Sequence, residues 1–374
     1  MFHKSKFDAG SVFGSGLFVE DFLSEKDKNH DERMRAVYKK IYTDCYLFQT
    51  DAINYAKKMI TKNLAEAEIS IDELKTLNVL NVGPCREAKV FADLGAKNVY
   101  HFDISDVAVN SLNELKKNGR YTNLHTMATD ICIPNSLSTK HKVDFVYLAG
   151  VLHHLHDPRQ AIKNIFNCIS NKSKLFFRIY RSGAFTYYNV EFIRKIIDYS
   201  WMDEVYKEAE NIKSLQSDIP DGRHNSIRTV LHDDFFVPVI NLFNPIELDN
   251  FFNACTFTNI NDKDYEKYNH SRIEPWSQGR SLIYKSDEFN NSIEIPKKFP
   301  GNTDQLDGIS YSEECIKRTN LMMREIIENK TQYSRSQLIK LAIRIYPHSL
   351  LNRKTHKKSC YENHNVLQEY LRDL

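Results

Sequence analysis

The stretch NVLNVGPCREAKVFADLGAKNVYHFDIS, at residues 78–105, decides the fold. It begins with a short β-like run of apolar residues that ends at Gly83, and a helical stretch over about residues 87–94 follows. The next apolar run is predicted to be a second strand, and it ends in the carboxylate of Asp103. In an open parallel sheet, ligands bind outside the carboxyl ends of the strands, where the first turn brings the backbone close to them. The stretch therefore predicts a βαβ unit with a ligand site between Gly83 and Asp103.

The same alternation of strands and helices continues along the chain. Further strands are predicted at residues 124–129, 145–148, 175–180, 257–260 and 281–284. Asp157 and Asn244 are expected to cap two helices, because each precedes a proline, and proline fits the first position of a helix. This alternation predicts an α/β fold in which helices cover both faces of a parallel sheet.

Segments of another character precede, interrupt and follow this α/β part. Apolar residues at three- and four-residue steps predict one long helix over residues 31–64. The alternation stops after Tyr180 and resumes at Asn244, and helices are predicted beyond residue 300 at 313–328, 334–346 and 366–374. The predicted organisation is an N-terminal helical segment or lid at 1–75, a core at 76–180, a substrate-side insertion at 181–240, the end of the core sheet at 241–290 and a helical C-terminal extension at 291–374.

Composition narrows the class of protein. Of the 374 residues, 41% are hydrophobic and 27% are charged, so a large core can form, and the net charge of +2 excludes a strongly basic nucleic-acid binder. The seven cysteines are scattered without a CxxC pair, which predicts reduced thiols and neither a disulfide framework nor a thiolate zinc site. No signal peptide is recognised, and the longest apolar run, residues 235–243, is too short to span a bilayer. We expect a soluble, cytoplasmic protein.

Two cofactor classes use the predicted sheet geometry. A dinucleotide site of the G-x-G-x-x-G type needs glycine where this chain has Cys85. The chain instead resembles the class I S-adenosylmethionine-dependent methyltransferases in four blocks that keep the family's order and spacing. The blocks are VLNVGPCRE at 79–87, VYHFDIS at 99–105, ATDI at 128–131 and VDFVYLAGVLHHLHDP at 143–158. Residues 244–285 are similar to the family's last helix and two strands.

The resemblance implies a fold, a cofactor and a set of binding residues. The fold would be a Rossmann-like, mostly parallel sheet with its last strand antiparallel. The cofactor would be S-adenosyl-L-methionine, with S-adenosyl-L-homocysteine as product. Asp103 would hold the ribose hydroxyls and Asp130 the adenine amino group. The residues that the resemblance places at the cofactor are Asn81, Gly83, Pro84, Cys85, Asp103, Ile104, Asp130, Ile131 and Ala149.

The first loop departs from the family in three places. Asn81 replaces an acid, and Cys85 and Glu87 replace two glycines, in a chain with only 12 glycines. Cys85 narrows the room for the cofactor, and Glu87 adds negative charge near the cofactor's carboxylate. Either Pro84 and Arg86 build a different turn that still binds the cofactor, or the fold serves as a non-enzymatic binding module. The intact Asp103, Asp130 and histidine pair favour the first alternative.

The methyl acceptor can be narrowed but not identified. The (N/D)PP(Y/F) block of adenine and cytosine amino-methyltransferases is absent, since residues 148–151 read LAGV, and no cysteine there supports attack on cytosine C5. His153 or His154 is the expected general base, because an imidazole titrates near neutral pH and lies just after the fourth strand. The HHxHD turn does not give the facing geometry of helical metal ligands, so no metal is predicted.

The insertion is expected to cover the substrate. Arginines that converge on a ligand suit a carboxylate or phosphate, although surface ion pairs are the alternative for some of them. The residues predicted to bind the acceptor are Arg178, Arg181, Tyr187, Arg228 and His232. The leading hypothesis is methyl transfer to an oxygen or nitrogen of a small, anionic or glycosidic acceptor.

A basic stretch supplies the rival hypothesis of an RNA- or tRNA-modifying methyltransferase. Residues 331–358 contain seven basic residues and no acid, as phosphate neutralisation would require. The same stretch has an apolar face at Leu338, Leu341, Ala342 and Ile345, which favours packing against the core. A small-molecule partner is therefore preferred to RNA, and the sequence leaves the oligomeric state open.

Overall fold

The structure is a computed structural model of the whole chain. It describes residues 30–44, 48–117, 119–180, 185–211, 228, 231–261, 279–289, 294–296, 300, 313–350 and 359–372. Among the predicted acceptor residues, Arg181 and the side chain of Tyr187 lie outside the described residues.

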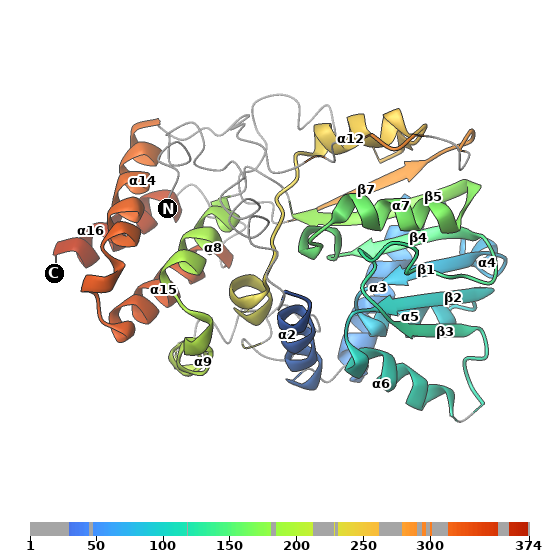
Figure 1. The fold of residues 1–374 in the computed structure, drawn as a ribbon, viewed down its shortest axis with the longest axis horizontal. Coiled ribbons are helices and arrows are strands. Elements are labelled where there is room, and N and C mark those ends of the chain that lie inside the picture. The colour runs from blue at the N-terminus through green and yellow to red at the C-terminus, as the bar shows by residue number, and fades with distance from the viewer. Residues whose placement is uncertain are drawn as a thin grey trace.

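A seven-stranded sheet forms the α/β half of the molecule (Figure 1). Its strands are β1 (Asn78–Val82), β2 (Asn98–Asp103), β3 (Leu124–Ala128), β4 (Val143–Ala149), β5 (Ile169–Tyr180), β6 (Thr258–Asn259) and β7 (Gly279–Lys285). The spatial order is β3-β2-β1-β4-β5-β7-β6, and β7 runs antiparallel to both of its neighbours. The order reverses between β1 and β4, which is the switch point where such sheets bind ligands. The predicted mostly parallel sheet with an antiparallel last strand is confirmed.

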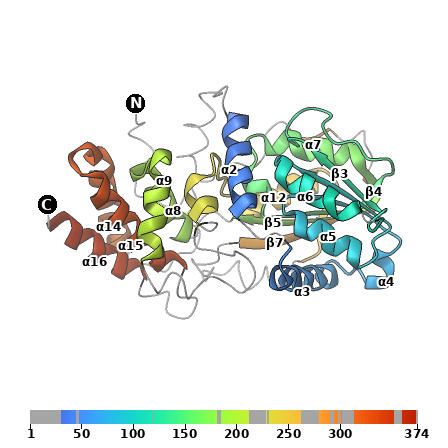
Figure 2. The ribbon, with the colours of Figure 1, turned by 90° about the horizontal axis from the view of Figure 1, so that it is seen from below.

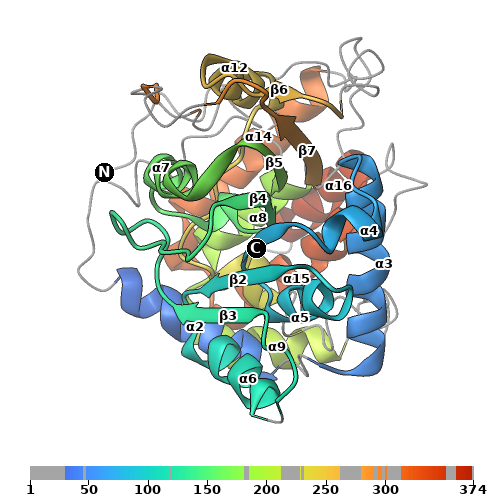
Figure 3. The same ribbon diagram turned by 90° about the vertical axis from the view of Figure 1, so that its right-hand side faces the viewer.

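Helices cover both faces of the sheet (Figure 3). One face packs against α3 (Thr50–Glu66), α4 (Ile71–Leu74), α5 (Cys85–Asp93) and α6 (Asp106–Lys116). The other face packs against α7 (Pro158–Cys168) and α12 (Pro245–Ala254). All five residues of β1 are buried, as expected for a central strand with both faces covered. The strand ends that carry the polar residues are therefore held rigidly.

The two predicted helix caps are present. The Asp157 side chain accepts a hydrogen bond from the Gln160 N–H, and the Asn244 side chain accepts one from the Ile246 N–H. The prolines that follow them occupy the first turn, where the missing N–H costs no helical bond. These local signals fix where α7 and α12 begin.

A second, helical half lies beside the carboxyl ends of the parallel strands (Figures 1 and 2). It consists of α8 (Phe185–Ile196), α9 (Met202–Glu210), α14 (Glu313–Glu328), α15 (Arg335–Leu350), α16 (Ser359–Arg372) and the π-helix η5 (His232–Phe236). One hydrophobic core runs through residues of the insertion and of the C-terminal extension, and the face of Leu338, Leu341, Ala342 and Ile345 is buried in it. The two segments, although far apart in sequence, fold together.

Helix α2 (His30–Asp44) lies between the two halves (Figure 2). Val37 belongs to the core of the helical half, whereas Tyr42 packs against the core on the sheet side. The single helix predicted over residues 31–64 is wrong, because the chain forms two helices, α2 and α3, with a break before Thr50. The spacing of apolar residues did not reveal this break, because α2 and α3 each have an apolar stripe that packs against a different part of the fold.

The C-terminal helices also differ in length from the prediction. α15 continues through Pro347 to Leu350, and α16 begins at Ser359. A proline near the last turn of a helix removes only one backbone hydrogen bond, so burial of the preceding residues can hold the helix together. No helix in the described ranges has the length and apolar character needed to cross a membrane.

A buried hydrogen bond joins the two segments of the helical half, and its removal should lower stability. The Tyr346 hydroxyl donates to Asp234 Oδ2 at 2.6 Å. Tyr346→Phe leaves that carboxyl group buried without its donor, so we expect the free energy of unfolding to fall by about 1–2 kcal/mol. Urea denaturation measures this change. Tyr333→Phe, at a half-buried tyrosine, is the control, and an equal loss in both variants would contradict the prediction.

Candidate functional site

The turn between β1 and α5 brings two loops into close contact. Gly83 has a φ of +107°, and a Cβ atom there would lie 2.4 Å from Val151 Cγ2. Only glycine fits, because an L side chain would be strained in φ and would overlap the loop after β4. Pro84 caps α5, and Cys85 begins the helix with its side chain fully buried in the core.

Asp103, at the end of β2, is held on both carboxylate oxygens. Its Oδ1 accepts from the Ser105 N–H at 2.7 Å, and its Oδ2 accepts from the Tyr42 hydroxyl at 2.9 Å. Burial raises the pKa of Asp103 to about 7, although both hydrogen bonds act in the opposite direction. Arg35 donates to the Ile104 carbonyl at 3.0 Å, so α2 contacts this strand end at two points. Tyr42 was not predicted as a site residue.

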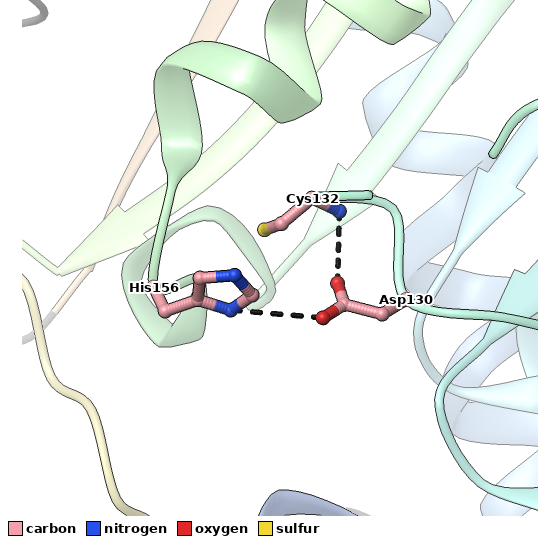
Figure 4. A group of neighbouring side chains, drawn as sticks. All are labelled: Asp130, Cys132 and His156. Carbon is pink, nitrogen blue, oxygen red and sulfur yellow. Dashed lines mark hydrogen bonds and ion pairs between the residues drawn. The ribbon is translucent and has the colours of Figure 1, made fainter. Parts of the chain in front are cut away.

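Asp130, after β3, accepts a hydrogen bond on one carboxylate oxygen and has only a longer contact with His156 on the other (Figure 4). Oδ1 accepts from the Cys132 N–H at 2.8 Å. Oδ2 is buried without a hydrogen-bond partner among the described residues, and His156 Nδ1 lies 3.6 Å away. A buried carboxylate oxygen in this state requires an N–H or O–H donor. The neighbouring Ile131 side chain is buried in the core.

The same three side chains are the group in the described part of the chain that could hold a metal ion. Ligand atoms of Asp130, Cys132 and His156 lie within 4.8 Å of one another. Burial and the nearby Asp130 raise the pKa of the Cys132 thiol well above its usual value, and a protonated thiol is a poor metal ligand. A cation there would also take the Asp130 oxygen that the sequence assigned to an adenine amino group, so the two uses exclude each other.

Asn81 is directed into the protein. It is fully buried, its Oδ1 accepts from His101 Nδ1 at 2.8 Å, and its Nδ2 donates to Glu87 Oε2 at 3.4 Å. Burial lowers the pKa of His101 to about 3 and raises the pKa of Glu87 to about 7. The amide of Asn81 therefore links two strands to α5. Where the family has an acid at the position of Asn81, the carboxyl group beside this loop in the present chain is that of Glu87, in the first turn of α5.

His153 and His154 lie in the short 3-10 helix η3 (Leu152–His154) that follows Ala149, the last residue of β4. His153 Nδ1 accepts from the Tyr180 N–H at 3.1 Å, and its ring stacks on Tyr180 at 3.5 Å between centroids. His154 Nδ1 donates to the Val239 carbonyl at 3.0 Å. Burial lowers the pKa of both histidines, to about 4 for His154. Both rings are neutral at pH 7.

Asp233, on the π-helix η5, completes this side of the site. Its Oδ1 lies 3.6 Å from His154 Nε2, and its Oδ2 accepts from the Tyr180 hydroxyl at 3.3 Å. Burial raises the pKa of Asp233 to about 6. The sequence showed the acids beside His232 but gave no signal that the insertion would return to the histidine pair. Asp233 is thus a functional candidate that sequence reasoning missed.

The predicted acceptor residues do not all converge on this place. Arg178 ends up close enough to Glu87 and His153 to affect the pKa of both. Arg228 forms an ion pair with Glu210 on α9 and lies over the Tyr206 ring, and His232 also contacts Tyr206. Their assignment to acceptor binding stays a prediction.

Members of the basic stretch contact acids of the helical half. Arg335 pairs with Glu204 at 2.7 Å, and Arg344 pairs with Glu369 at 2.9 Å. Residues 351–358, which include four of the seven basic residues, lie outside the described part of the chain. The described arginines therefore give no additional support to an RNA surface.

Residues 80–177 match the sequence model of the family described as "Methyltransferase domain". Together with the strand order and the placement of Gly83, Asp103 and Asp130, this match decides the identity of the α/β half. The chain carries a class I S-adenosylmethionine-dependent methyltransferase domain. The fold and the cofactor class predicted from the sequence are thereby confirmed.

Solved structures of other methyltransferases resemble this methyltransferase chain in part. The N-methyltransferase NodS from Bradyrhizobium japonicum, in complex with S-adenosyl-L-homocysteine, is 18% identical, with 40% of this chain and 74% of that chain covered and a TM-score of 0.31. The magnesium protoporphyrin IX methyltransferase from Synechocystis is 15% identical, with 70% and 100% covered and a TM-score of 0.38. The 1,6-didemethyltoxoflavin-N1-methyltransferase from Burkholderia thailandensis is 13% identical, with 72% and 87% covered and a TM-score of 0.36.

These likenesses do not define the acceptor of this methyltransferase domain, because all three TM-scores are below 0.5. No sequence among curated proteins matches the chain. The residues themselves must therefore show whether the cofactor fits.

Two observations show that the residues present suit S-adenosylmethionine. The Gly83 turn leaves no room for a side chain beside Val151, so the loops after β1 and β4 lie in close contact at the sheet edge where such a cofactor binds. The buried Oδ2 of Asp130 lacks a donor that an adenine amino group can supply. Asp103 fits a ribose if its hydroxyls share the carboxylate with Tyr42.

Proposed function

We propose that the protein transfers the methyl group of S-adenosylmethionine to an oxygen or nitrogen of a small acceptor. One observation carries the cofactor part of the proposal. Two buried carboxyl groups, Asp103 and Asp130, lie at the ends of neighbouring strands β2 and β3, beside a β1 turn that only glycine can form. This is the arrangement that an adenosine group requires at the switch point of a parallel sheet.

The chain's own residues would mainly hold and orient the reactants. When bound, S-adenosylmethionine would supply an electrophilic methyl carbon, and S-adenosylhomocysteine would be the leaving group when the acceptor attacks that carbon in line. Asp103 would accept hydrogen bonds from the ribose, Asp130 would accept one from the adenine amino group, and α2 would cover the nucleoside through Tyr42. Glu87, a half-buried acid on the first turn of α5, lies at the loop that would face the methionine end.

The acceptor would lie between η3, the end of β5 and η5. Tyr38, His154, Tyr180 and Asp233 meet there, and all four carry groups that accept or donate protons. Because two acids, the buried Asp234 and the partly exposed Asp233, adjoin this place, a polyhydroxylated or glycosidic acceptor suits it better than an anionic one. An acid on the acceptor would need Arg178 as its partner.

Calorimetric titration of the full chain with S-adenosylmethionine and S-adenosylhomocysteine tests the cofactor part. We expect both to bind at one site per chain. Binding of neither compound would contradict the enzyme proposal and favour a binding module on the same fold. A labelled-methyl transfer assay with small hydroxyl and amine compounds then tests the acceptor part.

Cofactor affinity should increase as the pH rises from 6 to 8. Ribose hydroxyls donate to an ionised carboxylate, and the pKa of Asp103 is about 7 in the folded protein. Below that pH, most Asp103 is protonated and must lose its proton before its carboxylate can accept hydrogen bonds from both ribose hydroxyls. The Kd for the cofactor should therefore be about tenfold higher at pH 6 than at pH 8. Calorimetry at several pH values measures this slope.

Asp103→Asn is the matched control for this pH dependence. It should bind the cofactor more weakly at every pH, with most of the slope between pH 6 and 8 removed. An unchanged slope in this variant would assign the titration to another group, such as Glu87, whose pKa is also about 7.

A further inference from the structure

We propose that Asp233 is the general base that takes the proton of the methyl acceptor, and that His154 is its positioning residue. The inference rests on the proposed methyl transfer and deepens it, since it specifies what the acceptor must be. It also moves the base from the histidine pair predicted by the sequence to an acid of the insertion.

The tautomer of His154 is fixed by the backbone. Its Nδ1 lies 3.0 Å from the Val239 carbonyl, which can only accept, so Nδ1 carries the proton. The lone pair of Nε2 then points toward Asp233 Oδ1 at 3.6 Å, and Nε2 is buried with no hydrogen-bond partner among the described residues. An unpaired buried nitrogen of this kind is satisfied when Asp233 becomes a carboxylic acid and donates its proton.

His153 is unsuited to the same role. Its Nδ1 accepts a hydrogen bond from the Tyr180 N–H, so the ring proton lies on Nε2 and the ring has no free lone pair. Taking up another proton would break that bond in a buried position, and burial already lowers the pKa of His153 well below its usual value. His153 instead orients Tyr180 by stacking on its ring.

Asp233 is more accessible to an acceptor than either histidine. Its side chain is 27% exposed, compared with 4% for that of His154. Tyr180 holds the second carboxylate oxygen, and Arg194 binds the carbonyls of Asp234, Phe235 and Pro238, which fixes the π-helix that carries Asp233. Short π-helical segments are often found at functional sites.

The groups around Asp233 set its pKa in the range of a useful base. Burial raises it to about 6, and the hydrogen bond from Tyr180 limits the rise. Among the described residues, the titratable or charged groups close to Asp233 include His154 on η3, Tyr38 on α2, the adjacent His232 and Asp234, and Arg194, which acts on both Asp234 and His154. A base with a pKa near the working pH exists largely as carboxylate and still accepts a proton effectively.

Asp233 also adjoins the cofactor side of the site. Burial and, after it, the carboxylates of Asp233 and Asp103 raise the pKa of Tyr38, so both carboxylates lie near this residue of α2. Tyr38 also contacts the His154 ring edge-on. An acceptor that reaches Asp233 is therefore next to the place proposed for the ribose.

The proton and electron balance is simple. The acceptor's O–H or N–H proton passes to the Asp233 carboxylate, and the resulting acid donates through Oδ1 to His154 Nε2. The electron pair released on the acceptor forms the bond to the methyl carbon as the carbon–sulfur bond breaks and leaves its pair on sulfur. The group that is methylated must therefore be a neutral hydroxyl or a nitrogen that bears a hydrogen. A group that is already deprotonated, or that carries no hydrogen, is not the methylated group.

Histidine NMR of the full chain tests the dyad without any acceptor. With 15N-labelled histidine, we expect His154 as the Nδ1–H tautomer, with an Nε2 shift that moves as Asp233 titrates near pH 6. Asp233→Asn should abolish that transition, whereas Asp234→Asn, the matched control on the same π-helix, should retain it. An Nε2–H tautomer, or a transition that persists in Asp233→Asn, would overturn the proposal.

Calorimetry and turnover separate this proposal from the proposed function. Asp233→Asn should bind S-adenosylmethionine within about twofold of the unmodified protein, because the residue is not among those proposed to hold the cofactor, and should lower kcat for a protic acceptor by about 100- to 10,000-fold. Failure of the unmodified protein to bind the cofactor would contradict the methyl-transfer proposal alone. Normal cofactor binding together with full turnover in Asp233→Asn would contradict the base assignment alone.

Discussion

Asp103→Ala is expected to weaken S-adenosylmethionine binding at least 100-fold. The substitution removes the carboxylate that would accept both ribose hydroxyls, and each hydrogen bond to a charged group contributes about 1.5–3 kcal/mol. It also removes the acceptor of the Tyr42 hydroxyl, so the contact of α2 with this strand end is weakened at the same time. Calorimetric titration with S-adenosylmethionine measures the change in Kd.

Tyr42→Phe separates the two effects of that substitution. It removes the contact with α2 and leaves the Asp103 carboxylate in place, so its cofactor affinity should change by about tenfold at most. Equal losses in Asp103→Ala and Tyr42→Phe would mean that closure by α2, rather than the ribose contact, provides the affinity. No loss in Asp103→Ala would show that the proposed cofactor pose is wrong.

Gly83→Ala is expected to lower the free energy of unfolding by about 2–4 kcal/mol and to abolish cofactor binding. The φ of +107° disfavours any L side chain, and the new Cβ would lie 2.4 Å from Val151 Cγ2. Relief of this overlap requires the loops after β1 and β4 to separate. That separation would disrupt the protein backbone that is proposed to contact the cofactor. Urea denaturation and calorimetry measure the two effects.

Gly119→Ala is the matched control for the strain at Gly83. Its φ is +71°, and a Cβ there meets no atom within 4 Å, so it reports the backbone strain without the overlap. We expect a loss of about 1–2 kcal/mol in that variant, with cofactor binding retained. If both variants lost the same stability, the contact with Val151 would not be the cause.

The α/β half could be predicted from sequence because its signals are local. Asp103 is the last residue of β2 and Asp130 lies two residues after β3, and strand ends of a parallel sheet meet at one edge whatever the rest of the chain does. Likewise, Asp157 and Asn244 fix the starts of their helices through bonds to residues two or three positions away. No distant contact is needed to place these residues.

The rest of the site depends on contacts between distant parts of the chain. Tyr42 reaches Asp103 across 61 positions, and Asp233 reaches Tyr180 across 53. Neither pairing leaves a periodic or spacing signal in the sequence. For Asn81 the sequence was misleading in another way. Its position in the motif predicts contact with the cofactor, but its amide forms hydrogen bonds with His101 and Glu87 inside the protein.

The position of α2 has a consequence for the traffic of ligands. This helix contributes Val37 to one core and Tyr42 to the other, and it hydrogen-bonds to Asp103 and to the Ile104 carbonyl. A nucleoside that bonds to Asp103 Oδ2 must share that atom with Tyr42 or displace it. Entry and departure of such a ligand are therefore coupled to the release of one helix from two hydrophobic cores, so the residence time of the spent cofactor depends on helix docking as well as on its own contacts.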